Sequence, residues 1–261
     1  MRISLKNKRA LIGGSSGGIG KAIAQQLAAS GASVTLMARN EDKLKSALES
    51  LATSEGQSHH YLVVDFSDYE GYKTIISKYF ESNSVDILIN NTQGPSAGNA
   101  LEKNVEDYQD AFNLLFKTVV FTTELALPYM IQNKWGRIIN VASISVKEPL
   151  SYLALSNAIR ASLVTWAKSL ATDVGDKKIT VNSILTGYFD TERIAQLNAK
   201  KAEQLGISED EVLADMKSKV PLKRIGDPKE YGYLVTFLAS DKAAFITGTQ
   251  IPIDGGLLKS L

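Results

Sequence analysis

The stretch GGSSGGIG at Gly13–Gly20 decides the fold of this chain. It directly follows an apolar run, Arg9–Gly13, and it opens a segment in which apolar residues recur at helical spacing. A helix N-terminus has unpaired N–H groups and a partial positive charge, and glycines let an anion come close to that backbone. Gly14, Gly18 and Gly20 keep the spacing Gly-x-x-x-Gly-x-Gly. The pattern therefore predicts a strand, a turn and a helix that together bind the pyrophosphate of a dinucleotide.

Two other interpretations of this glycine-rich stretch are weaker. A P-loop requires Gly-x-x-x-x-Gly-Lys-Ser/Thr. Here Gly20-Lys21 is followed by Ala22, and Ser15 stands where the first glycine of a P-loop belongs, so the motif is excluded. A glycine turn with a purely structural role remains the alternative, although so many glycines between a strand and an amphipathic helix argue against it.

Short apolar runs alternate with longer helical patterns along the chain. The runs predicted to be strands are Arg9–Gly13, Ser33–Ala38, Tyr61–Val64, Val85–Asn90, Gly136–Val141, Ile179–Leu185 and Gln250–Ile253. The first six are mostly Val, Ile and Leu, as strands buried on both faces are. The main segments predicted to be helices are Ile19–Ser30, Glu41–Thr53, Tyr69–Glu81, Val105–Gln132 and Ser156–Asp173. This alternation predicts an α/β fold, a doubly wound parallel sheet (Rossmann fold) in three α/β/α layers, as a single domain over residues 1–261.

Residues 190–219 form a charged, helix-rich insertion before the last predicted strand. A long segment near the carboxyl edge of a parallel sheet often closes over a substrate. We therefore expect a substrate lid here, and a pair of solvated surface helices is the alternative.

Composition excludes several classes of function. The net charge is +1, which offers no general attraction to nucleic acid or an anionic membrane. The chain has no cysteine, and its two histidines, His59 and His60, are adjacent in a polar stretch, so we expect no disulfide and no metal site. No signal peptide or run of about 18 apolar residues is evident, and we expect a cytoplasmic protein.

The end of the second predicted strand bears on the choice of cofactor. An NAD site usually places an acidic residue there to bind the ribose hydroxyls. This chain has Ala38 at that position and Arg39 next to it. A guanidinium can pair with a 2′-phosphate, so Arg39 favours NADP(H), and an ordinary surface charge is the alternative. The nearby Glu41 and Asp42 are better explained as first-turn residues of the next helix.

The chain resembles the short-chain dehydrogenase/reductase family over nearly its full length. The motifs that carry the resemblance occur in the family's order: the glycine stretch, Asp65 after the third strand, Asn90-Asn91-Thr92-Gln93-Gly94, Asn113, Asn140-Val141-Ala142-Ser143, Thr186-Gly187 with Thr191, and Thr247-Gly248 with Asp254-Gly255-Gly256. The resemblance implies hydride transfer between a nicotinamide and a carbonyl or alcohol, with Ser143 and Asn113 as catalytic residues. Together with Arg39, the residues it implies for cofactor binding are Gly14, Ser16, Gly18, Ile19, Gly20, Asp65, Asn91, Asn157, Gly187 and Thr191.

The family's Tyr-x-x-x-Lys pair is missing from this sequence. In the family the tyrosine protonates the substrate oxygen, and the lysine lowers the tyrosine pKa. The family's usual helix, aligned on Ala154 and Ala158, puts Leu153 at the tyrosine and Asn157 at the lysine. Asn157 can hydrogen-bond a ribose hydroxyl, but it has no charge with which to lower a phenol pKa of about 10. Arg160 lies three residues after Asn157 and also carries a positive charge, but the sequence does not fix where its side chain points.

Three side chains are candidates for the proton donor. Tyr152 is the first, although its displacement by one residue rotates it by about 100° on a helix. Tyr188 is the second candidate and Lys147 is the third. The alternative is that the two tyrosines only pack against other side chains and that Lys147 is a solvated surface side chain.

Two functions remain open at this point. The first is an NADP(H)-dependent oxidoreductase similar to 3-oxoacyl-carrier-protein reductases, acting on a small carbonyl or alcohol with Ser143, Asn113, Tyr152 and Asn157 in its catalytic site. The second is a catalytically weak NADP(H)-binding protein that serves as a sensor, scaffold or partner subunit. The resemblance also implies a homodimer or homotetramer that pairs through the helices at Val105–Gln132 and Ser156–Asp173.

Overall fold

Seven parallel strands form one sheet in the order β3-β2-β1-β4-β5-β6-β7 in the computed structural model, which describes residues 2–260. The strands are β1 (Arg9–Gly13), β2 (Ser33–Ala38), β3 (His60–Val63), β4 (Ile87–Asn90), β5 (Gly136–Val141), β6 (Ile179–Thr186) and β7 (Gln250–Ile253). The order reverses direction between β1 and β4. The sheet confirms the predicted doubly wound Rossmann fold.

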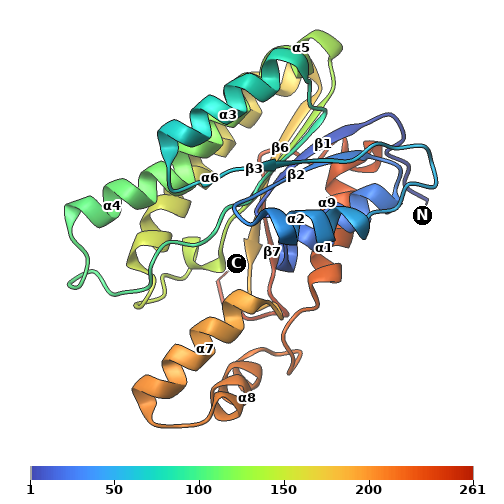
Figure 1. Ribbon diagram of the computed structural model, residues 1–261. Coiled ribbons are helices and arrows are strands. Elements are labelled where there is room, and N and C mark those ends of the chain that lie inside the picture. Colours follow the sequence, from blue (N-terminus) through green and yellow to red (C-terminus); the bar gives the residue numbers. More distant parts are fainter. Residues whose placement is uncertain (1, 261) are drawn as a thin grey trace.

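Helices cover both faces of the sheet (Figure 1). One face carries α1 (Gly18–Ala29), α2 (Glu41–Glu49) and α9 (Pro228–Ala239). The other carries α3 (Tyr69–Ser82), α4 (Val105–Phe112), α5 (Thr118–Asn133) and α6 (Ala154–Val174). Two further helices, α7 (Glu192–Leu205) and α8 (Glu209–Lys219), project from the carboxyl end of the sheet and occupy the segment 190–219.

The burial of the strands explains their composition. Every residue of β4 and β5 is buried, since helices pack on both faces of a parallel sheet. One layer of core side chains lies beneath α1, α2 and α9, and a second lies beneath α3, α5 and α6. The edge strand β7 is less buried and tolerates Pro252, which has no N–H for a further strand.

The segment predicted as one helix over Val105–Gln132 contains an irregular turn. A π-helical turn, η1 (Asn113–Lys117), separates α4 from α5. Such turns are rare and often lie at functional sites. Asn113, a residue singled out from the sequence, is the first residue of this turn.

The stretch Val105–Asn133 is long and apolar enough to cross a membrane by length and composition. In this fold it is a core helix. Leu115, Ala126 and Met130 are fully or almost fully buried in the core layer on that face of the sheet. The hydroxyls of Thr118 and Thr122 donate hydrogen bonds to backbone carbonyls one turn earlier, so these buried hydroxyls are paired within the helix.

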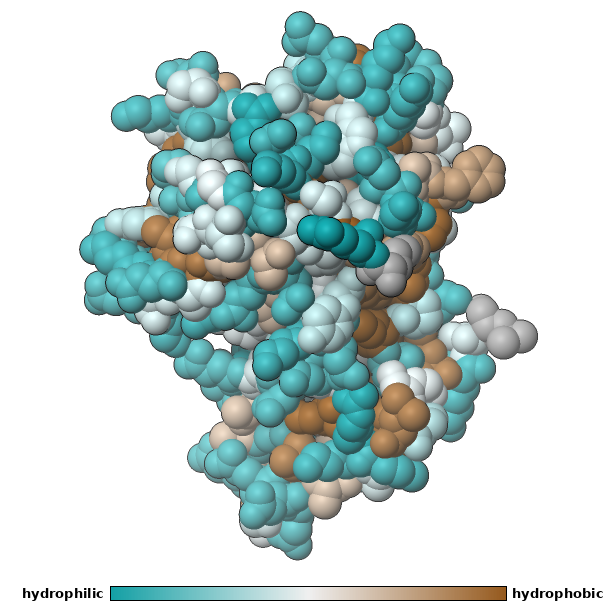
Figure 2. Space-filling model, turned by 90° about the vertical axis from the view of Figure 1, so that its right-hand side faces the viewer, coloured by the Kyte–Doolittle hydropathy of each residue, from teal (hydrophilic) through white to brown (hydrophobic). Residues whose placement is uncertain are grey.

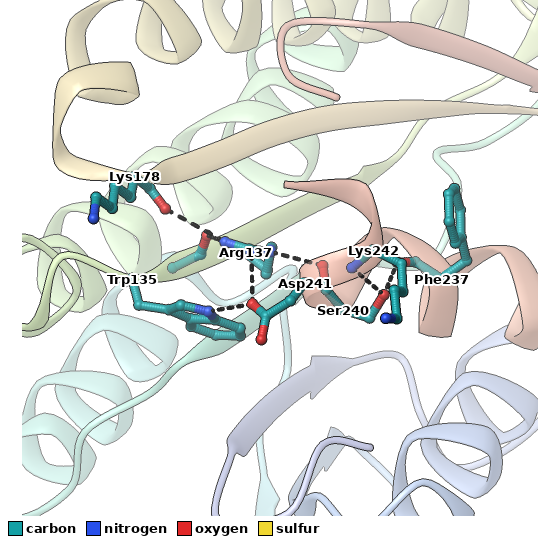
Figure 3. Close-up of polar contacts among 8 residues, drawn as sticks. Trp135, Arg137, Lys178, Phe237, Ser240, Asp241 and Lys242 are labelled. Atoms are coloured by element: carbon teal, nitrogen blue, oxygen red, sulfur yellow. Dashed lines mark hydrogen bonds and ion pairs between the residues drawn. The ribbon is translucent and has the colours of Figure 1, made fainter. Parts of the chain in front are cut away.

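A buried arginine fastens the amino end of the sheet, opposite the carboxyl edge (Figure 3). Arg137 of β5 is 2% exposed, and it donates to the carbonyl oxygens of Gly136, Lys178 and Ser240 at 2.9, 3.4 and 3.3 Å. It also pairs with Asp241 at 3.2 Å. Burial lowers the pKa of Arg137, and the Asp241 charge opposes that shift. The contacts join β5 to the start of β6 and to the end of α9, and they hold this end of the sheet closed.

Candidate functional site

The turn between β1 and α1 forms a cradle of bare backbone. Gly14 and Gly18 have positive φ angles, +54° and +51°, which residues with a side chain rarely adopt. A Cβ on Gly20 would lie 2.2 Å from the carbonyl oxygen of Gly14, so the first turn of α1 packs directly on the loop. Ser15 is buried beneath the turn, where its Oγ donates to the Ile12 carbonyl at 2.8 Å and accepts from the Met37 N–H at 2.9 Å. The cradle therefore fits an anion at the N-terminus of α1.

The loop after β4 supports this cradle from the other side. Asn91 donates from Nδ2 to the carbonyl oxygen of Gly13 at 3.0 Å. A Cβ on Gly13 would lie 2.1 Å from the backbone oxygen of Asn91, so only a glycine lets the two loops meet. Since β1 and β4 flank the point where strand order reverses, the contact lies where open α/β sheets bind their ligands.

A cavity of about 610 Å³ extends from this point across the carboxyl edge of the sheet. Its walls come from the glycine turn, the ends of β2, β4, β5 and β6, the start of α6, and α7. Of the residues predicted from the sequence, those that line it are Gly14, Ser16, Gly18, Ile19, Gly20, Arg39, Asn91, Ser143, Gly187 and Thr191. Four others, Asp65, Asn113, Tyr152 and Asn157, do not line it.

One end of the cavity is positively charged. Arg39, Asn40 and Lys43 line it after β2. Partial burial works to raise the pKa of Asp65, but hydrogen bonds from Ser67 and the Arg39 charge outweigh it and hold that pKa below its usual value. Asp65 thus lies near Arg39 although it is outside the lining. The Asn40 side chain caps α2 by accepting from the Lys43 N–H.

Ser143 lies at the other end of the cavity, just after β5. Its Oγ accepts a hydrogen bond from the Ser145 N–H at 3.1 Å and caps the 3-10 turn η2 (Ile144–Val146). Because Oγ is the acceptor in that contact, its own hydrogen is free to be donated into the cavity. This geometry suits a hydrogen bond to a substrate oxygen.

The first turns of α6 present Leu153, Ser156 and Arg160 to the cavity. The spacings of three and four residues place them on one face of the helix. Arg160 is 9% exposed, and its Nη1 donates to the carbonyl oxygen of Val141 at the end of β5. Ser156 is 7% exposed, and among residues 2–260 its hydroxyl has no hydrogen-bond partner.

The expected tyrosine and lysine positions lie elsewhere. Asn157 donates from Nδ2 to the Leu150 carbonyl at 2.8 Å, and its Oδ1 is buried without a partner among the described residues. Tyr152 is 46% exposed and lies beside Tyr188; partial burial together with that neighbour raises its pKa to about 12. The structure therefore differs from the expected alignment: Asn157 and Tyr152 sit outside the cavity, and Ser156 and Arg160 line it.

The remaining candidates from the sequence are also outside the lining. Asn113 accepts from Gln109 Nε2 at 3.1 Å within the π-helical region. Tyr188 lines a smaller neighbouring hollow with Leu222 and Arg224. Lys147 is exposed in the turn that follows η2.

Helix α7 lies over the cavity and is held at two points. Glu192 pairs with Lys43 of α2 at 2.9 Å. Arg193 donates to the carbonyl oxygen of Pro95 in the loop after β4 at 3.2 Å. Thr191 caps the helix, and its Cγ2 would lie 3.3 Å from a Cβ on Gly18. These contacts bring the start of α7 onto the glycine turn.

Sequence reasoning did not place Ser156 and Arg160 in the site, although the sequence contains a signal for them. Leu155, Ile159 and Leu163 recur every four residues and are buried in α6. Ser156 and Arg160 each follow one of these apolar residues, so they share the adjacent strip of the helix. A polar pair four residues apart beside an apolar stripe is the pattern that points toward a site.

Comparisons with known proteins agree with this geometry. A family model described as enoyl-(acyl carrier protein) reductase matches residues 14–258. The chain is 32% identical over 259 residues to the NADPH-dependent reductase BacG of Bacillus subtilis, a match that spans 98% of this chain and 100% of BacG. It is 34% identical over 256 residues to the 3-oxoacyl-[acyl-carrier-protein] reductase FabG of Rickettsia conorii, which spans 98% of this chain and 99% of FabG.

A solved structure supports the same relationship. L-sorbose reductase from Gluconobacter frateurii, complexed with NADPH and L-sorbose, superposes with a TM-score of 0.92 at 32% identity. The superposition covers 100% of both chains.

The close packing of the glycine turn can be tested with two matched substitutions. Gly20→Ala should lower the free energy of unfolding by about 2 kcal/mol, since its Cβ meets the Gly14 carbonyl. In a chain of this size that corresponds to a fall of about 4–8 °C in the midpoint of thermal unfolding. Gly17→Ala is the control, because a Cβ there meets nothing within 4 Å and the φ of −168° is extended. Equal midpoints for the two variants in differential scanning calorimetry would contradict the packing.

Proposed function

Because this chain belongs to the short-chain dehydrogenase/reductase family, we propose that it reduces the carbonyl group of a small molecule with NADPH. One observation carries the proposal: a single cavity joins the glycine cradle, the Arg39 end and the Ser143 end. A dinucleotide and a small substrate need these three regions to be continuous.

NADP(H) is the cofactor. Similar proteins are named as NADPH-dependent reductases or were solved with NADPH. The residues of this chain fit the group, since the glycine turn leaves no side chain between the α1 N-terminus and a pyrophosphate. Arg39 and Lys43 supply positive charge for a 2′-phosphate, and no carboxylate lines that position of β2.

The chemistry of the reduction is divided between the cofactor and the protein. When bound, NADPH supplies hydride from C4 of its nicotinamide ring. Ser143 donates a hydrogen bond to the carbonyl oxygen and orients the substrate. The apolar residues at this end, Val141, Leu153, Phe189, Ile194 and Leu197, favour a substrate whose surroundings are largely apolar.

We also propose that α7 and α8 act as a lid. Ile194 and Leu197 on α7 line the cavity, and the contacts of Glu192 and Arg193 tie the helix to opposite walls. Figure 2 shows a largely hydrophilic face on which hydrophobic side chains gather at the level of α7 and α8. Leu205, Ile207 and Leu222 are exposed in or beside this segment. Exposed polar contacts such as those of Glu192 and Arg193 can break at little energetic cost.

The proposed activity is tested by following loss of NADPH absorbance with a panel of ketones, aldehydes, quinones and a 3-oxoacyl thioester. We expect turnover of at least one carbonyl class and no comparable oxidation of NADPH without substrate. Tight NADPH binding without turnover of any compound would contradict a reductase and support the NADP(H)-binding sensor, scaffold or subunit. Among residues 2–260 no tyrosine lines the cavity, and this observation favours the second function.

The role of Arg39 predicts a change in cofactor preference. Arg39→Asp should raise the dissociation constant of NADPH by about 100-fold and improve binding of NADH relative to it, because a charge-assisted contact is replaced by repulsion. Fluorescence titration with both cofactors measures the change. Lys73→Asp is the control, since Lys73 is exposed on α3 and outside the cavity. Unchanged NADPH affinity in the Arg39 variant would refute the assignment.

The lid predicts a change in cofactor release. The double variant Glu192→Gln/Arg193→Gln should release NADPH about two- to thirtyfold faster, since each of the two exposed polar contacts is worth about 0.2–1 kcal/mol. Stopped-flow displacement measures the rate. The matched control is Lys200→Gln/Glu203→Gln, because both side chains are exposed on the same helix and neither lines the cavity. Identical release from the two double variants would show that α7 does not close the site.

A further inference from the structure

Arg160 is a buried cation that lacks an anionic partner. Its side chain is 9% exposed, and its one hydrogen bond to residues 2–260 goes from Nη1 to the Val141 carbonyl. No carboxylate among those residues pairs with it. Buried arginines are almost always paired, because desolvation of an unpaired charge is costly. The unpaired guanidinium therefore indicates a ligand with negative charge.

The surroundings of Arg160 keep its charge in place. Tyr231 of α9 lies near it and shares a hydrogen bond of 3.0 Å with Thr186 Oγ1 at the end of β6. Burial raises the pKa of Tyr231, so its phenol stays neutral. Burial also lowers the pKa of Arg160 to about 10, which still leaves the guanidinium protonated at neutral pH. Arg160 is thus a fixed positive charge between the ends of β5 and β6.

Ser156 lies one helical turn before Arg160 and also lines the cavity. Its hydroxyl has no partner among the described residues, so it is available as a donor. Ser143 lines the same end and has its own hydrogen free. Two hydroxyl donors and a guanidinium therefore line the end of the cavity opposite Arg39.

No ordinary acid shares this end of the cavity. Within the described part of the chain, the lining contains no tyrosine, histidine, cysteine or aspartate. Its single glutamate, Glu192, is paired with Lys43 at the other end. Besides Arg160, the remaining charged residues of the lining are Arg39 and Arg193. The site can thus stabilise negative charge on oxygen, but it has no side chain that readily gives up a proton.

We propose that Arg160 and Ser156 form, with Ser143, an oxyanion site that binds the substrate oxygen during reduction, and that water supplies the proton. This inference rests on the proposed reductase function. Hydride adds to the carbonyl carbon, and the carbonyl π electrons move to oxygen and give an alkoxide. The alkoxide accepts hydrogen bonds from the two serines beside the Arg160 charge and then takes a proton from water. Per turnover, one carbonyl, one NADPH and one proton give one alcohol and one NADP⁺.

Ser156 and Arg160 are four residues apart on α6. In the proposed site they take the places of the tyrosine and the lysine of the family's Tyr-x-x-x-Lys pair. A tyrosine whose pKa is lowered by lysine both donates a proton and ionises near neutral pH. Near neutral pH, serine and arginine side chains neither ionise nor donate a proton as the tyrosine does. The pH dependence of the reaction is therefore a readout that a merely structural role for these residues would not change.

The test uses the carbonyl compound that the panel shows to be reduced fastest. Arg160→Met should lower kcat by about 100- to 1000-fold, and Ser156→Ala by at least about tenfold, as for loss of an oxyanion donor. Arg160→Lys, which keeps the charge, should retain most activity. NADPH affinity by fluorescence should stay within about threefold in Ser156→Ala. Tyr152→Phe and Asn157→Ala are the matched controls from the same segment and should leave kcat nearly unchanged.

A pH profile completes the test. Reduction of the carbonyl compound by NADPH should vary little between about pH 6 and 9 in the unmodified enzyme, because hydride transfer gives the alkoxide before water protonates it and needs no side chain as proton donor. In the double variant Ser156→Tyr/Arg160→Lys, the rate of carbonyl reduction should fall as the pH rises, because a tyrosine donates a proton only while it is not ionised. The test still works if Arg160→Met fails to fold. Ser156→Ala removes one hydroxyl, and Arg160→Lys keeps the buried positive charge.

Three outcomes distinguish this inference from the proposed function. Normal kcat in Ser156→Ala and Arg160→Met, with loss in Tyr152→Phe, would overturn the oxyanion site and leave the reductase intact. A steep pH dependence of carbonyl reduction by the unmodified enzyme would also count against the oxyanion site. Absence of turnover by the unmodified enzyme with every carbonyl compound would contradict both.

Discussion

The close approach of backbone segments at the end of β1 is the constraint on which the rest of the site depends. Gly20 packs on the Gly14 carbonyl, and Gly13 packs on Asn91, at separations that leave no room for a Cβ. These contacts fix the N-terminus of α1 at the point where strand order reverses. The direction of the helix, the bare backbone for a pyrophosphate and the position of the β4 loop all follow from this packing.

Much of the fold could be predicted from the sequence because strands buried on both faces of a parallel sheet are nearly continuous apolar runs. The runs at Arg9–Gly13, Ser33–Ala38 and Gly136–Val141 coincide with β1, β2 and β5. Details that depend on tertiary contacts were less accessible. The helix expected over Glu41–Thr53 ends at Glu49, and the long helix after β4 contains a π-helical turn that apolar periodicity does not reveal.

The two ends of the site differed in how far the sequence could describe them. At the glycine turn, backbone conformation restricts the residue type so strongly that the motif alone indicates the geometry. On α6, the residues that line the cavity depend on helix rotation, and a shift of one residue turns a side chain by about 100°. Asn157 was expected in the site because the family's usual helix was aligned on Ala154 and Ala158. The buried stripe of Leu155, Ile159 and Leu163 sets the rotation in the structure and brings Ser156 and Arg160 to the cavity.

In the oxyanion site that we propose, serine and arginine handle the charge on the substrate oxygen differently from a tyrosine–lysine pair. A lowered phenol pKa lets one side chain deliver a proton as hydride arrives, so charge on the substrate oxygen is brief. A buried guanidinium cannot deliver a proton, but it stabilises that charge for longer, and low polarity around it makes the stabilisation stronger. The proposed site depends on access for water, and residues of α7 line the same cavity. Arg160 is buried with no anionic partner among residues 2–260, and desolvation of such a charge is costly; the proposed binding of a negatively charged oxygen would offset that cost.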